Sequence, residues 1–88
     1  MSRSIDDAIF SLLAERQPGQ TICPSEAARA VFAGPEPDGW RKLMPQVRAT
    51  AVGLARAGRL VITRKGHAAD PNGFKGIYRL RLPDGDAG

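Results

Sequence analysis

The N-terminal part of the chain has the hydrophobic period of an α-helix. Apolar side chains in Ile5–Leu13 recur at positions i, i+3, i+4, i+7 and i+8, which places them on one helical stripe. Ser4 precedes the stripe and is a favourable N-cap, and residues 17–19 (Gln-Pro-Gly) end the helix. The proline at position 24 favours an extended backbone just before it, so Thr21–Cys23 is predicted to be a short extended segment.

Two further helical regions are predicted in the middle of the chain. Ser25 is predicted to cap a helix of about ten residues. Its buried side is predicted to consist of Ala27, Ala28, Val31 and Phe32. Residues 34–39 contain two prolines and two glycines and are predicted to be a loop. A third region runs from about Trp40 to Ala57, with a short turn before Pro45 and the main helix from there on. Trp40 is expected to be a core anchor.

After the third helix the hydrophobic period changes to two. Arg59–Arg64 and Ile77–Leu82 alternate and are rich in β-branched and aromatic residues, so both are predicted to be strands. Residues 65–76 form a long connection with turn chemistry at Asp70-Pro71-Asn72-Gly73. In the second strand, the side chains expected to point into the core are those of Tyr78, Leu80 and Leu82.

The order of these elements indicates an α+β fold. Two strands cannot bury a face alone, so the hairpin is expected to pack on three helices, with Thr21–Cys23 as a third strand at its edge. This arrangement is typical of a winged helix, in which the hairpin loop is the wing. The alternative is an unrelated small α+β domain with a hairpin lid. We expect one domain, residues 1–82, and a flexible tail, residues 83–88.

Several short motifs resemble a known family. They are Cys23-Pro24-Ser25-Glu26-x-Ala28-Arg29, Trp40-Arg41-x-x-Met44-x-x-Val47-Arg48, Leu54-x-x-x-Gly58-x-Leu60, Lys65-Gly66 and Gly76. Together they are similar to domain-of-unknown-function family 3253, a group of short bacterial proteins. The resemblance implies a winged-helix fold and brings no reaction, ligand or catalytic residue with it.

The charges are distributed unevenly along the chain. Residues 1–40 carry three basic and six acidic side chains, a net charge of −3, whereas residues 41–88 carry ten basic and three acidic ones, a net charge of +7. The second part therefore presents a positive surface suited to an anionic partner, unless these groups serve only solubility.

The sequence also limits the cellular location. No apolar run approaches the ~20 residues that span a bilayer, and the N-terminus turns acidic at once, unlike a signal peptide. The single cysteine fits a reducing compartment. We expect a cytoplasmic protein with no membrane partner.

The candidate nucleic-acid-binding residues lie on the third helix and in the wing. On the helix, positions opposite the apolar arc and at its flank combine long basic or amide side chains with small residues that let the backbone approach a groove. In and beside the wing, basic residues are suited to sugar-phosphate contacts. The full set is Arg41, Lys42, Gln46, Arg48, Ala49, Gly53, Arg56, Arg64, Lys65, His67 and Lys75. A basic strip of outward-facing Arg79 and Arg81 is expected to extend the wing. Arg56 and Gln46 are the predicted base-reading residues, and Lys65 and Lys75 the predicted phosphate contacts.

Other chemistry is not expected. His67 has no neighbours at metal-ligand spacing, so no metal site is predicted, and no cofactor, small-molecule substrate or catalytic constellation is evident. Cys23 is interpreted as a small buried thiol, and Glu26 is expected to pair with Arg29, with Arg48 as a possible third member. The leading hypothesis is a DNA-binding regulator that is not an enzyme. The alternative is a protein-interaction module, a homodimer or an adaptor, that makes no DNA contact.

Overall fold

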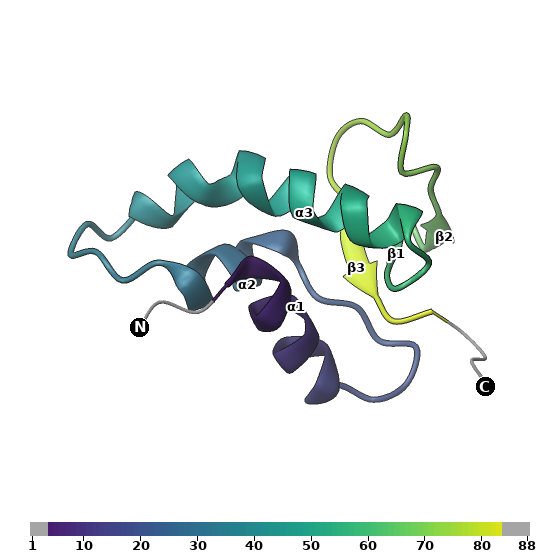
Figure 1. Cartoon of the computed structure of the whole chain (residues 1–88), viewed down its shortest axis with the longest axis horizontal. Helices are drawn as coiled ribbons and strands as arrows, with labels where there is room; N and C mark the ends of the chain where they lie inside the picture. The colour runs from purple at the N-terminus through teal and green to yellow at the C-terminus, as the bar shows by residue number, and fades with distance from the viewer. Residues whose placement is uncertain (1–3, 84–88) are drawn as a thin grey trace.

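The computed structural model describes residues 4–83, which form three α-helices and a small antiparallel sheet (Figure 1). The elements are α1 (Ile5–Ala14), α2 (Pro24–Val31), a 3-10 helix (Gly39–Leu43), α3 (Met44–Arg56), β1 (Val61–Arg64), β2 (His67–Ala68) and β3 (Arg79–Arg81). The predicted α+β class is confirmed. Within this part of the chain, none of the helices has the length and apolar character needed to cross a membrane. The predicted tail lies outside the described residues except for Pro83.

Helix α1 follows the sequence pattern closely. The hydroxyl of Ser4 accepts a hydrogen bond from the backbone N–H of Asp7 at 3.4 Å, so the predicted cap is confirmed. A hydrogen bond from the Ser4 side chain also lowers the pKa of the Asp6 carboxyl. The side chains of Ala8, Ile9 and Leu13 are buried, as the apolar stripe predicts.

Helix α2 begins two residues earlier than expected. Its N-cap is Cys23 rather than Ser25, because Pro24 fits the first helical turn. The N–H groups of that turn have no partner within the helix, so the proline, which has no N–H, costs no hydrogen bond there. The carboxylate of Glu26 accepts a hydrogen bond from the backbone N–H of Cys23 at 2.8 Å and forms an ion pair with Arg16. The predicted pair of Glu26 with Arg29 is therefore wrong, since this carboxylate faces the end of α1.

The sheet has the order β2-β1-β3, with both neighbouring pairs antiparallel. The two strands predicted from alternation are shorter than expected, and β2 lies inside the segment predicted to be a loop. Lys65 and Gly66 connect β1 to β2 with φ angles of 53° and 84°, the conformation of a tight two-residue hairpin turn. The expected third strand at the sheet edge is reduced to one bridge, in which Ile22 and Leu80 exchange two backbone hydrogen bonds of 2.8 and 3.0 Å.

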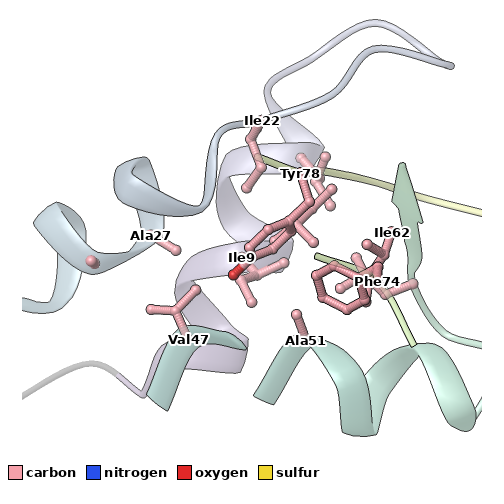
Figure 2. Close-up of a cluster of buried hydrophobic side chains, with 12 residues drawn as sticks. Ile9, Ile22, Ala27, Val47, Ala51, Ile62, Phe74 and Tyr78 are labelled. Carbon is pink, nitrogen blue, oxygen red and sulfur yellow. The ribbon is translucent and has the colours of Figure 1, made fainter. Parts of the chain in front are cut away.

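The core lies between the helices and the sheet (Figure 2). The largest fully buried side chains are Ile9, Val47, Ile22, Ile62 and Leu80. The loop between β2 and β3, residues 69–78, also contributes to the core, because Phe74 and Tyr78 are buried with ring centroids 5.0 Å apart. Leu82 was expected in the core but is 41% exposed, since β3 ends at Arg81.

Candidate nucleic-acid interface

The side of α3 that faces away from the core is open. Val47 and Ala51 of this helix are buried against the sheet and the other helices. The opposite positions are exposed, and they are Lys42 in the preceding turn and Gln46, Ala49, Gly53 and Arg56 in α3. A Cβ atom on Gly53 would meet nothing within 4 Å, so internal packing does not explain the glycine. We call this set the outer face of α3.

Arg48, predicted to flank the outer face, contacts the β2–β3 loop. Its guanidinium lies 3.9 Å from the centroid of the Phe74 ring and 5.8 Å from that of Tyr78. Its Nη2 atom donates a hydrogen bond of 2.7 Å to the carbonyl oxygen of Phe74. The suggested pairing of Arg48 with Glu26 is therefore wrong, and Arg48 fastens the β2–β3 loop to α3.

Arg56 makes a second contact to the same loop. Its Nε atom donates to the side-chain oxygen of Asn72 at 2.7 Å, and the backbone N–H of Asn72 donates to Asp70 at 2.9 Å. The loop therefore stands beside the C-terminal half of α3 (Figure 1). Because this contact turns the guanidinium towards the loop, Gln46 is the stronger candidate for reading a base edge.

The remaining predicted wing residues lie on the hairpin and the loop. Lys65 is in the tight turn, His67 is in β2 and Lys75 is in the β2–β3 loop, and all three side chains are exposed. Arg64 is half-buried, and its Nε atom donates to the carbonyl oxygen of Ile77 at 3.0 Å. Arg79 is exposed and donates to the hydroxyl of Thr21 at 2.6 Å.

The arginines of this region are held by neutral acceptors. Arg48, Arg56, Arg64 and Arg79 donate to carbonyl, amide or hydroxyl oxygens. Within residues 4–83 the ion pairs are Arg16 with Glu26 and, at 3.8 Å, Arg41 with Asp38. The four arginines are therefore held in position without losing their positive charge. Arg48 and Arg56 are held on α3 itself, whereas Arg79 is held at Thr21, between α1 and α2.

Trp40 does not have the environment expected of a core anchor. It is half-buried, and the Cζ atoms of Arg29 and Arg41 lie 4.5 and 4.7 Å from its ring centroid. It still packs on the edge of the core, so the expected core contact is present although the side chain is only half-buried. Arg29 is outside the predicted set of binding residues because its spacing pairs it with Glu26.

Comparison with known protein families gives one match over nearly the whole chain. A family described as protein of unknown function (DUF3253) matches residues 2–83. The chain belongs to the DUF3253 family. The resemblance seen in the sequence motifs is thus confirmed. A search of curated proteins finds no match.

Two further features of this DUF3253 domain concern its apolar side. An apolar hollow of about 330 Å³ is lined by Pro24, Met44, Ile77 and Tyr78, with Cys23 at its wall. Cys23 is half-buried rather than buried, and its Sγ atom lies 3.0 Å from the Ser25 hydroxyl. Ile77 is 87% exposed, whereas the hydroxyl of Tyr78 is buried with no hydrogen-bond partner among residues 4–83, and burial raises its pKa.

Proposed function

We propose that this chain is a winged-helix domain that binds duplex DNA, with the outer face of α3 in the major groove and the β2–β3 loop and hairpin as the wing. The element order supports this proposal, because a hairpin after three helices, with a bridge from Ile22 to the edge strand, is the arrangement expected of that fold. A helix in this position is the one that helix-turn-helix proteins place in the major groove.

The observation that carries the proposal is a pair of fixed positive charges, Arg48 and Arg56, beside an open helix face. Both arginines donate to neutral oxygens and keep their charge, so they and the exposed lysines can take the place of the counterions condensed on DNA. Ala49 and Gly53 carry no long side chain, which allows the backbone of α3 to approach base edges, and Gln46 supplies an amide that suits adenine.

The test is a titration of labelled random-sequence duplex at several salt concentrations. With four to six phosphate contacts, log K should fall with log salt at a slope of about −4 to −5. Replacing Lys65 and Lys75 together by alanine should make the slope shallower by about two, because both are exposed and suited to phosphate. Arg16→Gln is the matched control, since its charge is already compensated by Glu26. No binding at low salt would reject the DNA proposal.

The second candidate function is a protein-interaction module. It is favoured by Ile77, which is 87% exposed beside the apolar hollow, because large exposed apolar side chains next to an apolar surface mark contact sites. In that case Ile77→Ser should abolish partner capture, and the outer face of α3 should be covered in the complex. DNA binding that is unaffected by Ile77→Ser would favour the first candidate.

A further inference from the structure

The stack around Trp40 brings two positive charges together on one aromatic ring. Trp40 is the second residue of the 3-10 helix that leads into α3, and the guanidinium groups of Arg29 and Arg41 lie 4.5 and 4.7 Å from its ring centroid. Both arginines are exposed. Contact with an aromatic face orients a guanidinium without neutralising it, so the ring holds two positive charges in fixed positions.

Arg29 forms no ion pair among residues 4–83, although Glu36 and Asp38 line the hollow beside it. Glu26, the acidic residue of α2, is engaged by Arg16 and by the backbone N–H of Cys23. The pair of Arg41 with Asp38 is long, at 3.8 Å, and its side chains are 68% and 76% exposed, so it contributes little stability. Both guanidinium groups are therefore accessible to an anion that approaches the stack.

The loop before Trp40 is closely packed around one side chain. The ring of Phe32 occupies the space that a Cβ atom would need at Gly34 and at Gly39. Residues 34–38, together with Arg29, Phe32 and Trp40, line a hollow of about 420 Å³. The glycines therefore allow a tight turn over Phe32, and this turn sets where the Trp40 ring lies.

The 3-10 helix that carries Trp40 precedes the N-terminus of α3, and the hairpin of the proposed wing follows its C-terminus (Figure 1). Helix α3 has 13 residues. At a rise of about 1.5 Å per residue it is about 20 Å long, which exceeds the width of the major groove, about 12 Å. Groups at the two ends of such a helix are therefore far enough apart to contact phosphates on the two sides of the groove.

We propose that Arg29 and Arg41, held on the ring of Trp40, form a binding site for the phosphates of one DNA strand, while the wing contacts the other strand. This inference rests on the proposed function and adds a second phosphate site to it. Trp40 is a positioning residue here, and the two guanidinium groups make the contact.

The only tryptophan of the chain is therefore a reporter of its own site. Labelled random-sequence duplex is titrated into the full chain, with label anisotropy measuring binding and Trp40 emission measuring contact at the stack. Emission should change with the same Kd as anisotropy. Arg29→Gln and Arg41→Gln should each make the salt slope shallower by about 0.9, which is a loss of about 8-fold in affinity at 0.1 M salt. Trp40→Phe should retain most of the affinity and Trp40→Leu should not, because only an aromatic ring holds the guanidinium groups.

The outcomes separate the inference from the function on which it rests. If the Lys65 and Lys75 variant weakens binding while Arg29→Gln and Arg41→Gln match the Arg16→Gln control and Trp40 emission stays constant, this second site is rejected and DNA binding stands. If anisotropy detects no binding at low salt, both are rejected.

Discussion

Replacing Arg48 by alanine tests whether the β2–β3 loop is fastened to α3 as the structure indicates. The guanidinium donates a charge-assisted hydrogen bond to the Phe74 carbonyl and lies over the Phe74 ring. Hydrogen bonds of charged groups contribute about 1.5–3 kcal/mol, and a partly exposed cation–π contact adds about 0.5–1 kcal/mol. Because Arg48 is partly accessible to water, which replaces some of this energy, we expect a loss of about 2 kcal/mol.

The measurement is thermal unfolding, with hydrogen exchange as a local readout. For a domain of this size, about 2 kcal/mol corresponds to a fall in Tm of about 8–16 °C. Amide exchange should accelerate most in residues 69–78, where the loop loses its anchor. Lys42→Ala is the control, since this side chain is exposed at the start of the same helical region, and it should change stability by less than about 0.5 kcal/mol. A fall of less than about 2 °C for the Arg48 variant would refute this account of the loop.

Three other changes have expected outcomes. Gly53→Ala should raise the free energy of unfolding by about 0.5–1 kcal/mol, because the added methyl group lies in open space on a helix; it should also weaken DNA binding, and equal binding by titration would contradict a close backbone approach. Trp40→Ala should cost about 1.5–2.5 kcal/mol in chemical denaturation, half the range for a fully buried aromatic residue, since the ring is half-buried. Burial raises the pKa of Tyr78 above its ordinary value of 10.0, so the unfolded chain loses the phenol proton at a lower pH than the folded chain does. The free energy of unfolding should therefore fall as pH rises above about 10, and Tyr78→Phe should remove this part of the pH dependence.

The helices were predictable because each shows its buried side as a sequence period. The stripe of apolar residues in α1 predicts the side on which Ala8, Ile9 and Leu13 are buried, and the third region begins its main helix at Pro45 within one residue of the observed start. The start of α2 differs from the prediction by two residues because the preference for serine at the N-cap is weaker than the fit of Pro24 in the first turn.

The hairpin and the loop after it are less predictable, because their structure depends on contacts with distant parts of the chain and not on a local sequence pattern. Strand β2 has two residues, His67–Ala68, too few to show alternation. Phe74 lies among turn-forming residues, so periodicity gives no indication that it is buried, although a large aromatic residue in a polar loop is itself a sign that the loop packs inward.

A helical wheel predicts which residues of the candidate site are exposed, but it does not predict which residues elsewhere in the chain contact them. A wheel places Arg48 and Arg56 on or beside the outer face and cannot show that a loop distant in sequence meets them. The predicted pairing of Glu26 is wrong for the same reason, because Arg16, which follows α1, is closer in space than Arg29 on the same helix.

The anchoring of the loop and the charge of the surface depend on the same arginine, yet they are separable by experiment. Arg48 bonds a neutral carbonyl, so its removal lowers both the stability of the loop and the positive charge near it. Arg48→Lys keeps the charge and loses the planar group that stacks on Phe74, whereas Arg48→Gln keeps a hydrogen-bond donor and loses the charge. If Arg48 contributes to DNA binding only by holding the β2–β3 loop in place, the affinity of the two variants for DNA should fall in proportion to the fall in their Tm. If the charge itself contributes, Arg48→Lys should keep the salt slope of the unaltered chain even at a lower Tm, and Arg48→Gln should make it shallower by about 0.9. The same slope for both variants would assign Arg48 to the structure alone.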